Sequence, residues 1–177
     1  MLTEQELNKI FSWLPYRADW PVDRDDDDTI TGYYGDLISN LTKNKLFDTY
    51  HSNDSGLGNF LGFICYPPGH KEYNGNAIMV YINLCAPLAA YGQTTFQRLS
   101  NAYAYNFLKT DAVCTVTDVQ LKEIENEVIE ILSKYNLMLI DKAFACTPLP
   151  NEIAESLKHE NHNQGNRYLH GLFQETD

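Results

Sequence analysis

Residues 77–85 read Ala-Ile-Met-Val-Tyr-Ile-Asn-Leu-Cys, and every position of this run except Asn83 is apolar or aromatic. Successive side chains of a strand point to opposite faces of a sheet, so a strand of this composition is apolar on both faces. Residues 60–66, Phe-Leu-Gly-Phe-Ile-Cys-Tyr, have the same character. The two runs therefore predict strands inside a sheet that is covered at least partly on both sides.

Turn-forming residues lie between the two predicted strands. Pro67-Pro68-Gly69 and Asn74-Gly75 are sequences at which a chain commonly reverses. They predict antiparallel pairing through a long hairpin loop, and residues 53–58 predict another turn. Residues 93–108 fit either a helix or a strand, because a helical stripe of aromatic residues coincides with a composition rich in Thr, Tyr and Phe. We favour strand or irregular structure there.

Helices are predicted on the N-terminal side of this central region. Thr3 and Glu6 have the spacing of a capping box, and the apolar residues after them keep helical spacing as far as Pro15. Residues 15–28 predict a loop, and residues 30–47 predict a second helix.

The clearest helical pattern of the chain covers residues 118–135. Thr117 and Gln120 have capping-box spacing at its start, and Asn136 is a residue that commonly ends a helix. Apolar residues form one stripe of this helix and glutamates form the opposite side. The apolar stripe consists of Leu121, Ile124, Val128, Ile131, Leu132 and Tyr135.

Shorter elements are predicted in the C-terminal part of the chain. A strand is expected at residues 137–140, a short helix after Pro150, a polar loop at 161–166 and an edge strand at 168–173. In the short helix, the inward-facing residues are expected to be Ile153, Ala154 and Leu157.

The whole pattern predicts an α+β fold in a single domain that spans residues 1–177. We expect a central, mostly antiparallel sheet of about four to six strands, with the helices packed on it.

The net charge of −11 is distributed unevenly along the chain. Residues 1–60 carry 11 acidic and 5 basic side chains, and residues 118–177 carry the same numbers. Residues 61–117 carry only 2 acidic and 3 basic side chains. The basic residues are spread singly, so the chain lacks the clusters that bind nucleic-acid phosphates, and its charge repels anionic lipid headgroups. The same charge attracts a basic protein and speeds its encounter with the chain.

The cysteines predict a reducing compartment and no metal or cofactor site. Cys65, Cys85, Cys114 and Cys146 lack the short paired spacings of metal ligands, and three of them lie in apolar or β-branched runs. The N-terminus lacks the pattern of a signal peptide, and no window approaches the ~20 apolar residues of a membrane span. We therefore expect a cytoplasmic protein whose thiols are buried in the core.

No established catalytic or phosphate-binding motif is present in the sequence. The best nucleophile–base pair is Cys65 with His70, five residues further on across a turn, and a small hydrolase built on this pair is one alternative function. His159 and His162 lie three residues apart and could share a helix face with Glu155 or Glu160. Their polar surroundings favour exposure to solvent over a metal site, which would need further convergent ligands.

Residues 23–28 contain alternating aspartates that superficially match a calcium-binding loop. The loop of a calcium-binding hand needs Gly at its sixth position and Glu at its twelfth, and those positions are Asp28 and Tyr34 here. The motif therefore fails, which leaves either a solvated acidic loop or a docking patch for a basic partner.

The docking interpretation rests on the aromatic residues beside the acidic run. Repulsion among four consecutive aspartates costs stability in an isolated loop, and Trp and Tyr supply many of the anchors of protein interfaces. The residues predicted to contact a partner are Trp20, Asp25, Asp26, Asp27, Asp28, Tyr33 and Tyr34.

In its overall type the chain resembles the immunity proteins of bacterial toxin–antitoxin competition systems. The resemblance rests on the four aspartates at 25–28, on Ile-Met-Val-Tyr-Ile-Asn-Leu at 78–84 and on the ending Tyr-Leu-His-Gly-Leu-Phe-Gln-Glu-Thr-Asp. It implies a non-enzymatic inhibitor that binds a cognate basic toxin domain, often a nuclease. The alternatives are the small cysteine–histidine hydrolase and a module whose aromatic centre binds a small apolar molecule.

Overall fold

A computed structural model of the chain describes residues 2–53, 58–157 and 165–174. Its centre is a six-stranded sheet in which β1 to β5 are neighbours in chain order and β6 pairs with β4. All strand pairs are antiparallel except β4 with β6. The strands are β1 (Asp48–Asn53), β2 (Phe60–Tyr66), β3 (Tyr73–Asn83), β4 (Leu88–Arg98), β5 (Tyr103–Tyr105) and β6 (Met138–Leu139).

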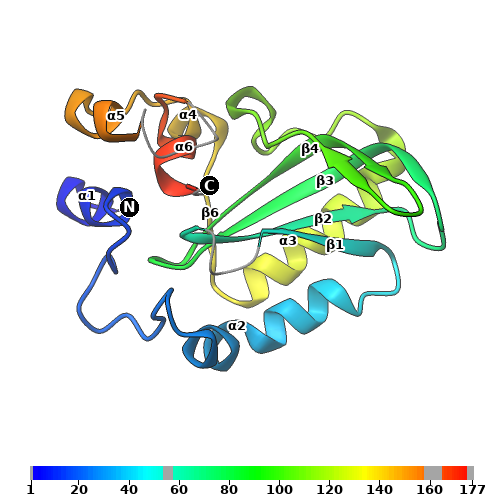
Figure 1. Cartoon of the computed structure of the whole chain (residues 1–177), viewed down its shortest axis with the longest axis horizontal. Helices are drawn as coiled ribbons and strands as arrows, with labels where there is room; N and C mark the ends of the chain where they lie inside the picture. Colours follow the sequence, from blue (N-terminus) through cyan, green and yellow to red (C-terminus); the bar gives the residue numbers. More distant parts are fainter. Residues whose placement is uncertain (1, 54–57, 158–164, 175–177) are drawn as a thin grey trace.

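Helices cover both faces of this sheet (Figure 1). α2 and α3 lie side by side on one face, while α1, α4, α5 and α6 gather at one end of the molecule. The helices are α1 (Glu4–Phe11), α2 (Asp27–Thr42), α3 (Lys122–Lys134), α4 (Lys142–Ala145), α5 (Asn151–Leu157) and α6 (Tyr168–Leu172), with short 3-10 turns η2 (Thr110–Ala112) and η3 (Val119–Leu121). The predicted α+β class and the mostly antiparallel sheet are confirmed.

The antiparallel pair predicted at the centre is also confirmed. β2 and β3 pair from Phe60 opposite Asn83 to Cys65 opposite Ile78. The ambiguous residues 93–108 supply the second half of β4 and all of β5, so the strand interpretation is right for them. The first half of β4, from Leu88, is not predicted by the sequence pattern.

Alternation along β3 divides the core into two layers. Met79 and Tyr81 pack in the layer that contains α1 and α6, whereas Ile78, Val80 and Ile82 pack in the layer that contains α2 and α3. Both sets are almost completely buried. The prediction that both faces of the central strands are covered is therefore confirmed.

Three segments cover the outer edge of β4. β6 pairs with its start and β5 with its end. Between them, the Cys114 amide donates to the Tyr91 carbonyl at 2.8 Å, and the Gln93 amide donates to the Thr115 carbonyl at 3.0 Å. An uncovered edge of this length would offer unpaired backbone groups to other chains, so this coverage protects β4 from aggregation.

The predicted start of the first helix is confirmed, but the predicted end of that helix and the predicted bounds of the second helix differ from the structure. The capping box of Thr3 and Glu6 is present at the start of α1. That helix ends at Phe11, so Leu14 lies outside it and is 54% exposed. α2 begins at Asp27 and ends at Thr42, which is several residues earlier at each end than predicted.

The start of α3 differs from the predicted capping box. The carboxylate of Asp118 accepts the Gln120 amide at 3.0 Å, and the turn η3 precedes the regular helix. Thr117 instead donates its amide to Gln93 Oε1 at 2.8 Å, so it binds β4 rather than capping the helix. The predicted apolar stripe faces the core, and Asn136 ends the helix with a φ of 55°.

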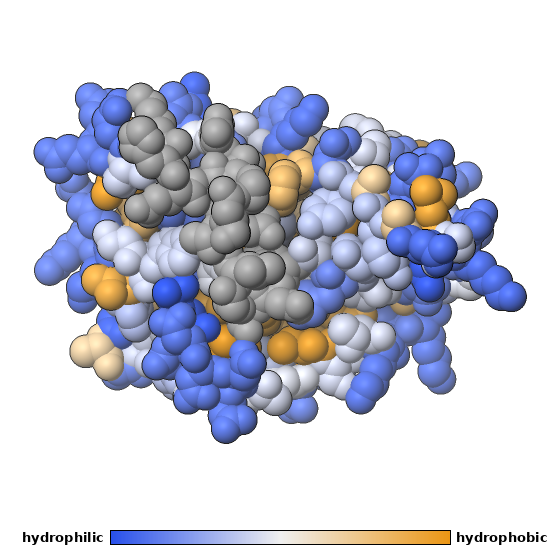
Figure 2. Space-filling view, in the orientation of Figure 1, coloured by the Kyte–Doolittle hydropathy of each residue, from blue (hydrophilic) through white to orange (hydrophobic). Residues whose placement is uncertain are grey.

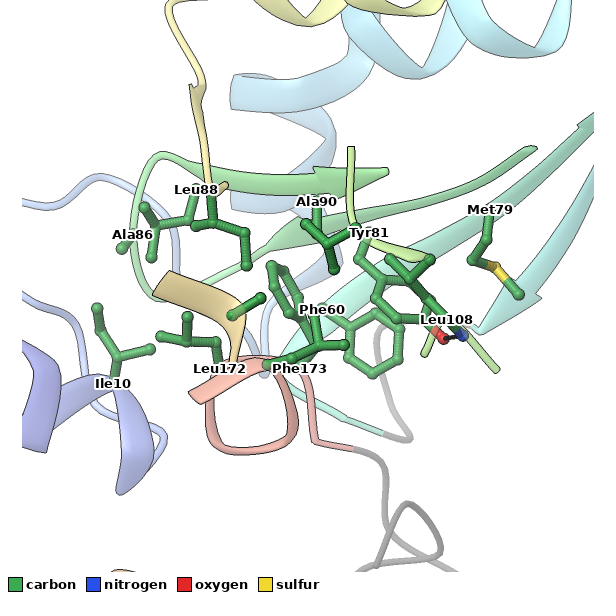
Figure 3. Packing of buried hydrophobic residues seen from close by; sticks show 14 of the residues in the cluster. Ile10, Phe60, Met79, Tyr81, Ala86, Leu88, Ala90, Leu108, Leu172 and Phe173 are labelled. Carbon is green, nitrogen blue, oxygen red and sulfur yellow. Dashed lines mark hydrogen bonds between the residues drawn. The ribbon is translucent and has the colours of Figure 1, made fainter. Parts of the chain in front are cut away.

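The edge strand predicted at residues 168–173 is wrong, because these residues form α6 and the turn after it. Leu169, Leu172 and Phe173 are all 0% exposed, a spacing of three and four residues that puts them on one side of a helix. The ring centroids of Phe60 and Tyr81 lie 5.9 and 5.5 Å from that of Phe173 (Figure 3). A run this short satisfies the strand and helix periods almost equally well, which explains the error.

The prediction of buried thiols holds for two cysteines and fails for a third. Cys65 and Cys85 are buried, and burial raises the pKa of each thiol to about 12. Cys114 is exposed, because its backbone turns with a φ of 53° where the chain leaves the edge of β4. Cys146 is intermediate.

We expect native thiol labelling to separate these cysteines. Cys114 should react with a thiol reagent within minutes in the folded protein, while Cys65 and Cys85 should react only on unfolding. Partial burial raises the pKa of Cys114, so its labelling should accelerate as the pH rises above the ordinary thiol range. Mass-spectrometric mapping of the labelled peptides checks this, and native labelling of Cys65 before Cys114 would contradict it.

Some predictions fall on residues outside the described part of the chain. They are the middle of the turn at 53–58, most of the polar loop at 161–166, and the positions of His159 and His162. Within the described residues, every helix is too short or too polar to cross a membrane.

Candidate partner-binding surface

Three successive carbonyl groups at the end of β3 accept hydrogen bonds from α2 and from the segment between α1 and α2. The Tyr34 hydroxyl donates to the carbonyl of Asn83 at 3.1 Å, and the Trp20 indole donates to that of Leu84 at 2.7 Å. The Tyr16 amide donates to the next carbonyl, that of Cys85, at 2.9 Å. This segment has no regular secondary structure, so these bonds determine where its aromatic rings lie.

The aromatic rings of this region form a continuous row. Successive ring centroids lie 5.4 Å apart for Tyr16 and Trp20, 5.1 Å for Trp20 and Tyr33, and 4.8 Å for Tyr33 and Tyr34. Each pair meets edge to face, the arrangement that aromatic quadrupoles favour. The row passes from the half-buried Tyr16 and Trp20 through the exposed Tyr33 to the buried Tyr34.

The two adjacent tyrosines of α2 have opposite environments. Tyr33 is 43% exposed, which is consistent with the predicted contact to a partner. Tyr34 is 1% exposed, and burial raises the pKa of its hydroxyl far above the usual value. The prediction that Tyr34 contacts a partner is wrong, because neighbouring positions of a helix point in directions that differ by about 100°.

A guanidinium lies between an aromatic ring and a carboxylate at the same surface. Arg24 Cζ is 4.5 Å from the centre of the Trp13 ring, and Arg24 Nη2 is 3.2 Å from Asp25 Oδ1. The Trp13 indole in turn donates to Gln174 Oε1 at 2.7 Å, which fixes the ring although its backbone has a φ of 61°. The sequence pattern identifies neither Trp13 nor Arg24 as part of this surface.

The acidic run is folded into the start of α2 and is not wholly a loop. Asp26 is the N-cap, and its carboxylate accepts the Asp28 amide at 3.0 Å. Asp27 and Asp28 occupy the first helical turn, where the positive end of the helix dipole stabilises negative charge. The expected cost of repulsion among the four aspartates is therefore partly offset by the helix.

All four aspartates of the run are exposed. They follow the exposed Pro21 and Asp23, and Asp27 and Asp28 precede Tyr33 by less than two turns of α2. We call the set Trp20, Tyr33 and Asp25–Asp28 the acidic aromatic surface. Its chemistry suits a lysine or arginine side chain of a partner, since carboxylates pair with such cations and aromatic rings attract them.

The proposed catalytic pair is not assembled in this structure. Cys65 is fully buried in the layer of α2 and α3, and its raised pKa leaves the thiol protonated at neutral pH. His70 is exposed in the β2–β3 loop, where its ring lies 5.5 Å from that of Tyr73. Among the described residues, no three His, Cys, Asp or Glu side chains come close enough to hold a metal ion.

A second group of aromatic residues lies on the face of the sheet opposite α2 and α3. The rings of Tyr50 and Tyr103 stack at 4.3 Å, and Tyr103 is 49% exposed. Arg98 donates to the Tyr66 hydroxyl at 2.8 Å beneath them. Where the surface in Figure 2 is not grey, hydrophobic residues form separate small areas among hydrophilic ones.

Comparisons with protein-family models, with curated protein sequences and with solved structures gave no match to this chain.

Proposed function

We propose that this chain is a non-enzymatic binding protein that captures a basic protein domain through the acidic aromatic surface. In line with the resemblance to immunity proteins, we propose that the domain is a cognate bacterial toxin, for example a nuclease, and that binding blocks its active surface. The cytoplasm, where the toxin would otherwise act on the producing cell, is the proposed location.

The observation that supports this proposal most directly is the Arg24 guanidinium. It contacts both the Trp13 ring and the Asp25 carboxylate, so Asp25 of the acidic aromatic surface already holds a cation in the way a partner's arginine would be held. The pair of Trp20 and Tyr33 offers a second ring edge, and the aspartates of the acidic run are exposed, so a partner's cations can reach them. A hydrogen bond to a carbonyl group at the end of β3 holds the Trp20 ring in place, and Tyr33 packs against that ring. Less ordering is therefore needed when a partner binds, which lowers the entropic cost of binding.

The test takes any basic domain that is encoded next to this chain's gene, purifies it and mixes it with this protein. The variant Asp25→Asn/Asp28→Asn should slow association about 3- to 10-fold at low ionic strength, because long-range attraction controls the encounter rate. Tyr33→Ala should instead speed dissociation at least about tenfold, as expected for an interface anchor. Stopped-flow mixing and surface-immobilised binding measure the two rates.

A matched control is available on α3. Glu123→Gln/Glu130→Gln removes the same number of exposed charges from another surface, and it should leave both rates nearly unchanged. Equal effects of the two double variants would show that net charge alone attracts the partner and would contradict a specific surface. Co-expression should also protect a host from the toxin domain, and protection that survives Tyr33→Ala together with the Asp25 and Asp28 changes would place the inhibitory surface elsewhere.

A further inference from the structure

A polar cleft opens on the sheet beyond the start of α3, away from the acidic aromatic surface. Its volume is about 300 Å³, at the lower end of the range for sites that bind small ligands. Side chains of β3 and β4 form one wall, and the segment 106–117 forms the other. The side chains that line it include Asn76, Gln93, Thr95, Asn106, Phe107 and Lys109.

Hydrogen bonds fix the orientation of the Gln93 amide. Its Oε1 accepts the backbone N–H groups of Thr117 and Asp118 at 2.8 and 2.9 Å, and the Thr117 hydroxyl at 3.2 Å. Only an oxygen can accept from two backbone N–H groups, so the NH2 group must point the other way. Within the described residues that NH2 group donates to no other atom, and Gln93 lines the cleft.

The Asn76 amide is fixed in the opposite sense. Its Nδ2 donates to the Asp118 carboxylate at 2.9 Å. An ionised carboxylate only accepts, so the nitrogen of Asn76 faces Asp118 and the oxygen faces away. Among the described residues, no group donates to this oxygen. Asn76 lies opposite Thr95 in the β3–β4 register, and Gln93 is two positions along β4 on the same face of the sheet.

The cleft therefore presents a fixed donor and a fixed acceptor on one wall. The opposite wall adds the Asn106 side chain, whose Nδ2 donates to the Thr95 hydroxyl oxygen at 2.5 Å. Phe107, half-buried, adds an aromatic surface. Polar groups on two walls beside one ring fit a ligand that has hydroxyl groups around an apolar framework.

An anionic ligand fits this cleft poorly. The backbone N–H groups at the start of η3, which could bind an anion, already donate to Gln93. The cationic Lys109 is accompanied by Asp111 in the lining, and Asp118 lies directly behind Asn76. The lining thus carries no excess positive charge, which a phosphate or carboxylate ligand would require.

We propose that this cleft binds a small neutral molecule rich in hydroxyl groups, of the size of a monosaccharide. Gln93 donates to one hydroxyl oxygen and Asn76 accepts from another, while the C–H face of the sugar ring packs on Phe107. The site is open and its groups are neutral, so the dissociation constant should be about 1–10 mM. This binding is independent of the acidic aromatic surface.

The experiment is a titration of the 15N-labelled protein with glucose, galactose, mannose, N-acetylglucosamine and myo-inositol, followed by 1H–15N correlation spectra. At least one of these probes should shift the side-chain NH2 signals of Gln93 and Asn106, together with backbone signals of residues 93–95 and 106–109. Inorganic phosphate and sulfate serve as anionic comparisons. No shift with any of the five probes at ~50 mM would overturn the proposal, because this concentration exceeds the expected dissociation constant. Shifts produced only by the anions would overturn it as well.

Gln93→Glu tests the role of the fixed donor. It retains an oxygen acceptor for Thr117 and Asp118 but replaces the NH2 group, so sugar affinity should fall about 3- to 10-fold, the loss expected for one neutral hydrogen bond. Gln97→Glu makes the same change on the same face of β4, outside the cleft lining, and should leave the affinity unchanged. Equal losses in both variants would overturn the proposed donor role.

Discussion

Gly92→Ala should destabilise this protein by about 3 kcal/mol or more, the upper end of the cost of overpacking a core. Gly92 is buried in the middle of β4, where an added Cβ would overlap the carbonyl oxygen of Ala112 and lie 2.8 Å from Leu108 Cδ1. The obstacle is backbone, which cannot rotate away as a flexible side chain could. Urea unfolding followed by circular dichroism measures the change in the free energy of unfolding.

The same substitution at Gly32 is the matched control. Gly32 is exposed within α2, and a Cβ there would meet no atom within 4 Å. Because alanine favours the helix over glycine, Gly32→Ala should stabilise the protein by about 0.5–1 kcal/mol. A tolerated Gly92→Ala would show that residues 108–113 do not close over β4 as the structure places them.

The close approach of Ala112 to Gly92 is an example of a contact that could not be predicted from the sequence. The apolar runs of β2 and β3 predict the central pair correctly, because a run apolar on both faces has few alternatives. The first half of β4, by contrast, reads Leu-Ala-Ala-Tyr-Gly, and small residues there carry little strand signal. Gly92 has no side chain because the backbone of Ala112 packs against it, which a local pattern cannot reveal.

The candidate surface was predictable to a similar extent. The acidic run and its neighbouring aromatic residues stand out in the sequence, and the structure brings Trp20 and Tyr33 into contact. The separation of Tyr33 from Tyr34 depends on the register of α2, which begins earlier than its apolar pattern suggests. The position of Arg24 over Trp13 depends on an irregular segment that is held by hydrogen bonds to carbonyl groups at the end of β3. Such contacts do not follow from the spacing of apolar residues in the sequence.

The C-terminal segment gives the second large expected effect. Leu172→Ala should lower the free energy of unfolding by about 2–5 kcal/mol and Phe173→Ala by about 3–5 kcal/mol. These are the usual ranges for truncating buried aliphatic and aromatic side chains. Both side chains are 0% exposed, and Phe173 contacts the rings of Phe60 and Tyr81 on the sheet. Figure 3 shows Leu172 and Phe173 side by side beneath Leu88 and Phe60.

This pair of variants distinguishes α6 from the edge strand that the sequence pattern favours. In an edge strand, Leu172 and Phe173 would point to opposite faces, and one of them would face solvent and tolerate alanine with a change of less than about 0.5 kcal/mol. In α6 and the turn after it, both side chains enter the same core layer, so neither tolerates truncation. His170, between Leu169 and Gly171, is only half-buried. His170→Ala should therefore lower the free energy of unfolding by clearly less than either of the other two substitutions. Thermal and urea unfolding of the three variants measure these changes in stability. If either Leu172→Ala or Phe173→Ala left the stability unchanged, the edge strand would be favoured and α6 would be contradicted.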